Sequence, residues 1–296
     1  MQIVASGLNF IYSEKSKSLA VKALDDITLT VKEGEFFGIV GHTGSGKSTF
    51  VQHLNGLIKV GKDKGELRVG EFNLSDPKNC DYIKLRSKVG MVFQYPEYQL
   101  FAETVFEDVA FGLKNFFPEM GENEITERVQ TAIELVGLNY EKIKDKSPFE
   151  LSGGQKRRVA IAGVIVSRPE VLVLDEPAAG LDPVGKREFI RLLHTIHKSF
   201  VKTIIIVSHD MDLVSENCTR AVVFSKGKIV LDGTPKEIFS DSERVEKLGL
   251  DIPVTAYLTN ALKEKGIIVD SDLTVDDFIK KLSLTLDKNN KGGDQV

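Results

Sequence analysis

One eight-residue stretch near the start of the chain constrains the fold more than any other. It reads Gly41-His42-Thr43-Gly44-Ser45-Gly46-Lys47-Ser48, which fits the pattern G-x-x-x-x-G-K-[ST]. An apolar segment typical of a buried strand precedes it, and a helix-like segment, residues 49–57, follows it. Glycines let the backbone close around an anion with its N–H groups pointing inward, and a helix start adds partial positive charge. The stretch therefore predicts a phosphate-binding loop between a strand and a helix.

Within this loop we expect Lys47 to reach the β- and γ-phosphates of a nucleotide and Ser48 to hold Mg²⁺. His42 occupies a free position of the pattern and receives no role. The other residues of this region expected to bind the nucleotide are Gly41, Thr43, Gly44, Ser45, Gly46 and Thr49.

A pair of carboxylates follows the apolar run at residues 171–174. Asp175 and Glu176 come directly after this predicted strand, and strand ends at the carboxyl edge of a parallel sheet line the ligand crevice. Asp175 suits Mg²⁺, directly or through water, and Glu176 can accept a proton from an attacking water. Alone, the pair could be a solvated turn after an edge strand; beside a phosphate loop, the catalytic interpretation is favoured.

Two more polar residues follow predicted strands directly. Gln94 comes after the strand at residues 88–93, and His209 comes shortly after the strand at 203–207. A lone polar residue at a strand end is usually structural. Two of them on the edge that carries the phosphate loop favour a functional interpretation.

A second candidate anion site is the segment Leu151-Ser152-Gly153-Gly154-Gln155, which precedes a helix-like run at residues 156–166. Ser152 can cap this helix, and the glycines expose backbone N–H groups at a helix start. One chain has no obvious need of two anion sites, so a simple helix cap is the competing interpretation.

The order of predicted elements indicates an α/β protein. Strand-like segments occupy residues 3–11, 27–31, 35–40, 67–74 and 89–93, and return at 171–174, 203–207, 221–224 and 228–231. Residues 103–166 between them have helical periodicity, which predicts a helical insertion into an α/β core. Two short amphipathic helices are expected at 254–265 and 275–284.

Composition excludes several classes of protein. The chain has 296 residues, 42% hydrophobic and 28% charged, as in ordinary globular proteins. A net charge of −4 gives no basic surplus for nucleic acid, so none is expected as a partner. No apolar run approaches the ~20 residues of a membrane span, and the first ten residues do not resemble a secretory signal. Cys80 and Cys218 have no metal-like spacing and are expected to be reduced structural residues.

The motifs GHTGSGKST, Gln94, LSGGQ, VLVLDE, AGLD and SHD occur in the order found in the nucleotide-binding subunits of ABC transporters, which residues 2–240 strongly resemble. The resemblance implies a P-loop NTPase (RecA-like) core, residues 1–94 and 167–240, with an antiparallel β subdomain. It also implies an inserted α-helical subdomain, residues 95–166, that carries LSGGQ. Residues 241–296 would form a small C-terminal helical extension with a disordered end at 288–296.

The resemblance also implies how the sites are used. In the family, two subunits face head to tail, with ATP between the phosphate loop of one and the LSGGQ segment of the other. Ser152, Gly153, Gly154 and Gln155 would then complete the partner's site. Gln94 resembles the glutamine that senses Mg²⁺ and water. Asp182 of AGLD resembles the aspartate that couples the two sites, and His209 resembles the histidine that acts as the γ-phosphate switch.

Two further positions matter to the resemblance. Tyr12 aligns with the aromatic residue that stacks on adenine, with Phe10 as its rival on the same strand face. Ala178 stands where the family usually has Thr or Ser after Glu-Pro. It lacks the hydroxyl, but we expect only a modest effect on the ATP site, since this residue is not a phosphate ligand.

A finer resemblance is to the energy-coupling-factor vitamin importers. The strings FQYPEYQLFAETVFEDVAFG and SPFELSGGQKRRVAIAG look like the second of their two ATPase subtypes, and LGLDIP at residues 248–253 looks like their C-terminal extension. The implied partners are a second ATPase subunit (of the other subtype, or a second copy), a transmembrane coupling subunit and a membrane-embedded substrate-binding subunit. The implied location is peripheral, on the cytoplasmic face of the cell membrane.

Two other functions compete with a transport motor. A DNA-repair or ribosome-associated ABC ATPase is disfavoured because the chain has no long coiled coil, no second cassette and no basic patch. A P-loop kinase is disfavoured because it has no use for LSGGQ beside a glutamate placed for water. The aromatic-rich residues 95–106 follow Gln94 and are predicted to dock the membrane subunit, with Tyr98 and Leu100 on the docking surface. Alternatively, these aromatics pack the helical insertion onto the core.

Overall fold

Two β-sheets organise the computed structural model, which describes residues 1–12, 20–270 and 273–292. Within these residues one sheet has six strands in the order β10-β9-β3-β8-β7-β6, and the other has four in the order β2-β1-β4-β5. In the larger sheet, neighbouring strands among β9, β3, β8, β7 and β6 pair in parallel, and β10 pairs antiparallel with β9. The smaller sheet is antiparallel throughout. The strand bounds are β1 Ile3–Tyr12, β2 Val21–Val31, β3 Phe36–Gly41, β4 Glu66–Val69, β5 Phe72–Asn73, β6 Val89–Val92, β7 Val171–Asp175, β8 Thr203–Val207, β9 Arg220–Ser225 and β10 Lys228–Gly233.

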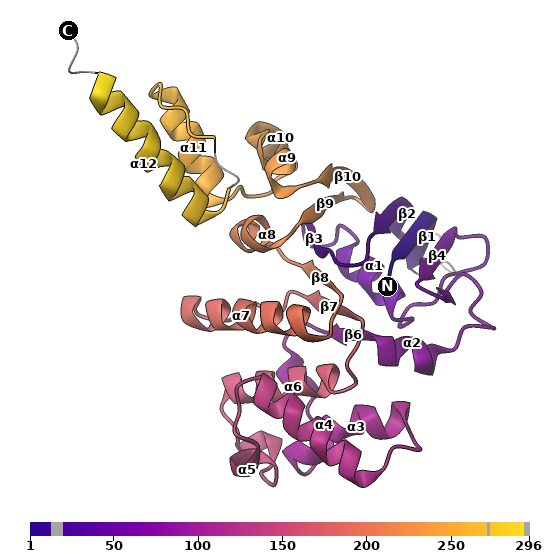
Figure 1. Ribbon diagram of the computed structural model, residues 1–296. Coiled ribbons are helices and arrows are strands. Elements are labelled where there is room, and N and C mark those ends of the chain that lie inside the picture. Colours follow the sequence, from indigo (N-terminus) through magenta and orange to yellow (C-terminus); the bar gives the residue numbers. More distant parts are fainter. Residues whose placement is uncertain (13–19, 271–272, 293–296) are drawn as a thin grey trace.

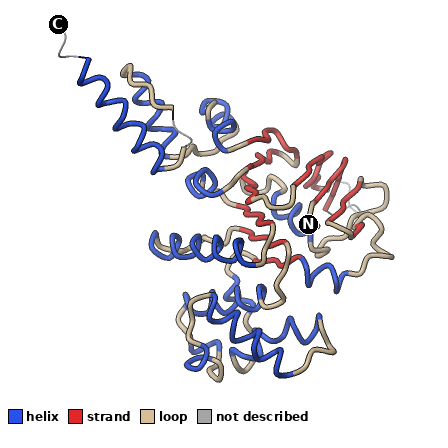
Figure 2. The backbone as a smooth tube through the Cα atoms, viewed as in Figure 1, coloured by secondary structure: helices blue, strands red, loops and turns tan. Residues whose placement is uncertain are grey.

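Helices α7 and α8 lie beside the six-stranded sheet, α3 to α6 form a separate group, and α11 and α12 project away from the sheet at the C-terminal end (Figure 1; Figure 2). The helix bounds are α1 Lys47–Leu54, α2 Tyr82–Lys88, α3 Val105–Phe116, α4 Glu122–Leu135, α5 Tyr140–Ile143, α6 Gly153–Ile165, α7 Pro183–Ser199, α8 Met211–Asn217, α9 Pro235–Phe239, α10 Ser242–Lys247, α11 Val254–Glu264 and α12 Val275–Gly292, with short 3₁₀ helices η1 Pro96–Gln99 and η2 Pro148–Glu150. The predicted fold class is therefore confirmed: an α/β core with an antiparallel sheet, a helical insertion and helices at the C-terminal end.

Two predicted strands differ from the structure. The segment 67–74 is a hairpin of β4 and β5 rather than one strand, because Gly70 turns the chain with φ +54°. The segment predicted to begin at residue 27 begins at Val21, where it pairs with Tyr12 of β1. Both differences arise from turn and pairing geometry that a local apolar pattern does not specify.

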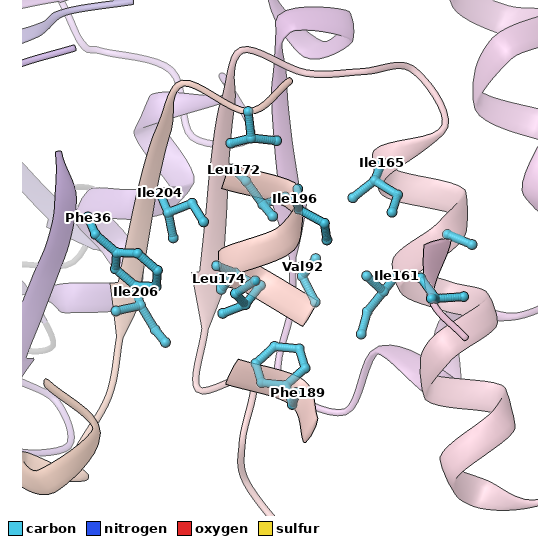
Figure 3. Packing of buried hydrophobic residues seen from close by; sticks show 14 of the residues in the cluster. Phe36, Val92, Ile161, Ile165, Leu172, Leu174, Phe189, Ile196, Ile204 and Ile206 are labelled. Atoms are coloured by element: carbon cyan, nitrogen blue, oxygen red, sulfur yellow. The ribbon is translucent and has the colours of Figure 1, made fainter. Parts of the chain in front are cut away.

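Strands β3, β7 and β8 are buried along their whole length, as expected for parallel strands covered on both faces. One face of the six-stranded sheet packs against helices α6 and α7 (Figure 3). The labelled residues of this core are Phe36, Val92, Ile161, Ile165, Leu172, Leu174, Phe189, Ile196, Ile204 and Ile206. This packing fixes the strand ends that carry the candidate site.

A buried arginine joins the helical insertion to the core. Arg157 of α6 donates from Nε to Glu97 Oε2 over 3.1 Å and from Nη2 to the carbonyl of Ala179 over 3.0 Å. Glu97 lies in η1, just after Gln94, and Ala179 lies in the loop after β7. One side chain therefore connects the LSGGQ helix to two loops near the carboxyl edge of the sheet.

The C-terminal extension begins at α10 and leaves the core beside α8 (Figure 1). Its backbone is tied to the core where Val254 N–H donates to Asp212 Oδ1 over 2.8 Å. Helix α12 runs to Gly292, so the end predicted to be disordered is helical up to that residue, and residues 293–296 lie outside the described residues. Among the described residues, none of the helices has the length and apolar character needed to span a bilayer.

We predict that Arg157→Met lowers the free energy of unfolding by about 3 kcal/mol, because it leaves the Glu97 carboxylate unpaired in a largely buried place. The side chains of Arg157 and Glu97 are only 7% and 19% exposed. Urea unfolding monitored by circular dichroism measures the change.

The matched control is Arg128→Met in α4, whose ion pair with Glu124 is more exposed and should cost less than about 1 kcal/mol. Adding Glu97→Gln to Arg157→Met should recover part of the loss, since the unpaired charge is gone. Equal losses in Arg157→Met and Arg128→Met would show that the buried pair does not hold the insertion in place.

Candidate active site

The phosphate loop has the backbone that its glycines predict. Gly46, the N-cap of α1, has φ +107°, a conformation that other residues rarely adopt. A Cβ on Gly46 would lie 2.3 Å from the carbonyl oxygen of Ala23, and one on Gly41 would lie 2.3 Å from that of Phe224. The chain's own packing therefore requires glycine at both positions, because a side chain at either one would collide with the backbone.

Lys47 turns back into the loop, where its Nζ donates to the carbonyls of Gly41 and His42 over 2.6 and 2.7 Å. Burial lowers the pKa of this ammonium, and the nearby charges of Glu176 and Asp175 oppose that effect. The hydroxyl of Ser45 is buried and, among the described residues, has no hydrogen-bond partner. An unsatisfied buried hydroxyl and a buried ammonium in one glycine cradle fit a bound phosphate.

Ser48 and Asp175 meet across the cleft from two different elements. Ser48 Oγ in α1 donates to Asp175 Oδ1 at the end of β7 over 3.2 Å. Burial raises the pKa of Asp175, and the Ser48 hydrogen bond acts in the opposite direction. Hydroxyl and carboxylate oxygens are donors that Mg²⁺ accepts, so these residues fit that ion. In the described ranges, no group of three or more His, Cys, Asp or Glu side chains is placed to hold a metal.

Glu176 and His209 form a hydrogen-bonded pair beside the loop. Glu176 has φ +49°, an uncommon conformation for a non-glycine residue that often marks functional sites. Its N–H donates to the carbonyl of Val207 over 3.0 Å, which fixes it to the end of β8. His209 Nδ1 lies 2.8 Å from Glu176 Oε2 and donates to it when the carboxylate is ionised. The Glu176 side chain is 17% exposed and that of His209 is 73% exposed, so the imidazole reaches outward from the site.

A single cleft of about 460 Å³ brings most of the predicted residues together. Its lining includes Tyr12, Thr43, Gly44, Gly46, Lys47, Ser48, Thr49, Gln94, Asp175, Glu176 and His209. Gly41 and Ser45 lie buried beneath it. Sequence reasoning missed Val21 and Ala23, which also line the cleft and could have been found from the alternation of apolar residues at the start of β2.

The end of the cleft nearest α1 and the first two strands carries an exposed aromatic ring. Tyr12 is 42% exposed, and its hydroxyl lies 3.2 Å from Thr49 Oγ1. Phe10 contacts Tyr12 edge to face, with ring centroids 4.8 Å apart, and packs against buried His53 on its other side. Phe10 is not among the residues that line the cleft. The geometry therefore favours Tyr12 over Phe10 as a surface for a base.

The second predicted group lies outside this cleft. Ser152 and Gln155 form a reciprocal capping box at the start of α6, and Asp182 caps α7 by accepting from Gly185 N–H over 2.7 Å. Gly154 and Asp182 line a separate pocket of about 240 Å³. A Cβ on Gly153 or Gly154 would meet nothing within 4 Å, so this chain's own packing gives no reason for these two glycines.

The aromatic segment at residues 95–106 is not one uniform surface. Tyr98 and Phe101 are exposed, at 84% and 59%, whereas Leu100 is 7% exposed and belongs to the core. The expectation that Leu100 lies on the surface is wrong, because the chain after η1 turns this side chain inward. A pocket of about 330 Å³ lies here, lined by β6, α3 and α6 among other elements, and includes Leu57, Phe101, Phe111 and Phe116.

Comparisons with known proteins agree with this geometry. A family model described as ABC transporter matches residues 24–179. The chain is 46% identical over 289 residues to the energy-coupling factor transporter ATP-binding protein EcfA2 of Clostridium tetani (strain Massachusetts / E88), covering 98% of each chain. It is 49% identical to the protein of the same name from Clostridioides difficile (strain 630), covering 92% of this chain and 93% of the relative.

Solved structures agree in fold. CbiO1 from Clostridium perfringens, described as part of the ABC transporter complex CbiONQ, matches with a TM-score of 0.71 and 39% identity over 87% of this chain and 98% of that one. The ATP-binding cassette MJ0796, solved as a dimer bound to ADP and Pi, matches with a TM-score of 0.69 and 27% identity over 79% of this chain and 98% of that one. From the family match and the nearly full-length relatives, we conclude that the chain belongs to the ABC transporter family.

Proposed function

We propose that this chain binds ATP and Mg²⁺ and hydrolyses the ATP to power import by an energy-coupling-factor type ABC transporter. The observation that carries the proposal is the single cleft in which the phosphate loop, Asp175, Glu176, Gln94 and His209 converge. The names of the relatives supply the transporter type.

Each side chain of the cleft has a distinct part in hydrolysis. Lys47 and the loop N–H groups bind the β- and γ-phosphates, where charge develops in the transition state. Ser48, Asp175 and Gln94 would hold Mg²⁺, which neutralises phosphate charge when bound. Glu176 accepts a proton from the attacking water. His209 orients the Glu176 carboxylate through Nδ1–H and lines the same cleft, where it would sense the γ-phosphate.

We predict that Glu176→Gln still binds ATP but hydrolyses it about 10²- to 10⁴-fold more slowly, since the amide keeps the shape and loses the base. Hydrolysis is measured as phosphate release with no added phosphoryl acceptor, which also separates an ATPase from a kinase. In the head-to-tail arrangement, the variant should accumulate as an ATP-bound dimer on gel filtration.

The control is Glu71→Gln, which removes a surface carboxylate that pairs with Lys84 and Lys88 outside the cleft. It should hydrolyse ATP at the wild-type rate. Wild-type turnover in Glu176→Gln would remove this residue from its proposed role.

We further propose that the site is completed by a second ATPase subunit, whose Ser152, Gly153, Gly154 and Gln155 contact the ATP bound here. The support is the exposed, capped start of α6, whose glycines have open space around them. Asp182, which lines a pocket with Gly154, would couple the two sites. The partner is a subunit of the other subtype or a second copy of this chain.

Mixing two inactive variants tests the shared site, provided that the wild-type chain hydrolyses ATP without another subunit. Lys47→Ala removes the phosphate-binding ammonium, and Ser152→Arg blocks the start of α6. Each variant alone should be inactive. In their mixture both lesions can fall on one composite site, so the other site is intact and activity should return to a fraction of wild type. No recovery at any ratio, with dimers present, would contradict shared sites.

We propose that the chain works as a peripheral subunit on the cytoplasmic face of the membrane, with a transmembrane coupling subunit and a membrane-embedded substrate-binding subunit. Its docking surface would be the pocket flanked by Phe101 and Phe111, whose rings lie 4.9 Å apart and are 59% and 51% exposed. Gln94 lies a few residues before Phe101, and Glu97 between them is bound to Arg157 of the LSGGQ helix. Closure of the ATP site can therefore move this pocket as a rigid body.

We predict that Phe101→Asp combined with Phe111→Asp leaves folding and ATP binding intact but weakens recovery of the chain with membranes. Transport should fall further than ATP hydrolysis, because the subunit is uncoupled rather than inactive. The control is Ile268→Asp, which changes an apolar side chain that is 74% exposed in the C-terminal extension. Normal assembly and uptake by the double variant would exclude this surface as the dock.

A further inference from the structure

The segment at residues 248–253, LGLDIP, contacts the phosphate loop, although it lies beyond the residues matched by the family model. His42 Nε2 donates to the carbonyl of Leu248. The two residues are 206 positions apart in sequence. Gly249 comes next with φ +68°, and a Cβ there would lie 2.8 Å from both Cε1 and Nε2 of the His42 ring. The ring and the segment therefore fit closely, with a glycine where any side chain would displace the imidazole.

The other end of the same segment is fixed to the start of α8, directly after the loop that carries His209. Val254 N–H donates to Asp212 Oδ1 over 2.8 Å, and Asp212 lies in the first turn of α8, three residues after His209. Between the two ends, Leu250 is buried and Ile252 packs on the core. A cleft of about 540 Å³ separates this part of the segment from His209. The segment is thus anchored at both ends and in the middle.

His42 links this anchor to the catalytic lysine. Its main-chain carbonyl accepts from Lys47 Nζ, and its ring donates to Leu248. The neighbouring loop residues Thr43 and Gly44 are exposed, and a Cβ on Gly44 would meet nothing within 4 Å. Among the described residues, the Leu248 contact is the one side-chain hydrogen bond of His42, so it limits where this part of the loop can move.

We propose that His42 and the 248–253 segment are positioning residues of the ATP site. The C-terminal extension holds the phosphate loop through His42 and the start of α8, just after His209, through Asp212, and so fixes these two parts of the site relative to each other within one chain. This inference rests on the proposed ATPase function and adds a role for the extension in ATP affinity. Because coupling between two sites is reciprocal, bound ATP must in turn stabilise the docked segment.

The competing interpretation is that the contact only attaches the extension to the core. In that case its loss would lower thermal stability or loosen the extension, and ATP affinity would stay the same. The experiments below therefore measure ATP affinity and stability on the same variants.

The first experiment compares His42→Ala with His42→Gln by equilibrium ATP binding and thermal unfolding. His42→Ala should weaken ATP binding about three- to tenfold, the range expected for one hydrogen bond. His42→Gln should recover most of this affinity, since its amide N–H₂ can reach the Leu248 carbonyl. The matched control is His197→Ala, because the His197 ring makes the same type of bond to the carbonyl of Lys202, over 3.0 Å, away from the site. It should bind ATP as the wild type does.

The second experiment changes the segment without touching any loop residue. Gly249→Ala places a methyl group against the His42 ring, whereas Gly266→Ala has similar backbone strain, with φ +79°, and nothing within 4 Å of its Cβ. Both should lose stability, but only Gly249→Ala should also weaken ATP binding. In a His42→Ala background the added loss from Gly249→Ala should shrink, because the ring it displaces is gone.

The reciprocal effect is measured by amide hydrogen exchange of residues 249–254 with and without ATP. Exchange should slow with ATP in the wild type and change little in His42→Ala. Unchanged ATP affinity in both His42→Ala and Gly249→Ala would overturn the inference, and so would an equal loss in Gly249→Ala and Gly266→Ala. If the wild type does not bind ATP, the proposed function fails instead, which separates the two failures.

Discussion

The parallel pairing of β3, β8 and β7 is the constraint on which the site depends. In this register Ile39 is opposite Val207, and Val207 is opposite Asp175. The chain therefore leaves all three strands at one edge, with the phosphate loop after β3, the two carboxylates at the end of β7 and the His209 loop after β8. Backbone bonds hold these exits together: Ser208 N–H donates to Ile39, and Glu176 N–H donates to Val207, over 3.1 and 3.0 Å. A shift of one residue would turn every side chain to the other face of the sheet.

The same constraint explains what the sequence could predict. Strands that are apolar throughout can be identified directly from the sequence. The polar residues that follow them must then lie at the carboxyl edge of the parallel sheet. Gln94, Asp175, Glu176 and His209 were located in this way, and one cleft contains all four.

Residues whose environment is set by distant parts of the chain were not predictable. Leu100 lies in an aromatic segment with the pattern of a surface, yet packing turns it into the core. His42 occupies a free position of its motif, and its partner is 206 residues away in sequence. Nothing in the sequence distinguishes Glu97 from the other charged residues, and only the structure shows that it pairs with Arg157. In each case the signal is a tertiary contact, which no local pattern contains.

The glycines of the two anion-binding motifs differ in what requires them. Gly41 and Gly46 are crowded by carbonyl oxygens of this chain, so its own fold excludes any side chain there. Gly153 and Gly154 are the first two residues of α6 and have open space around them, so this chain's own packing requires glycine at neither position. Glycines at these positions leave the free backbone N–H groups of the helix start accessible from outside. In the head-to-tail arrangement that we propose, a phosphate held by a second subunit would approach this helix start.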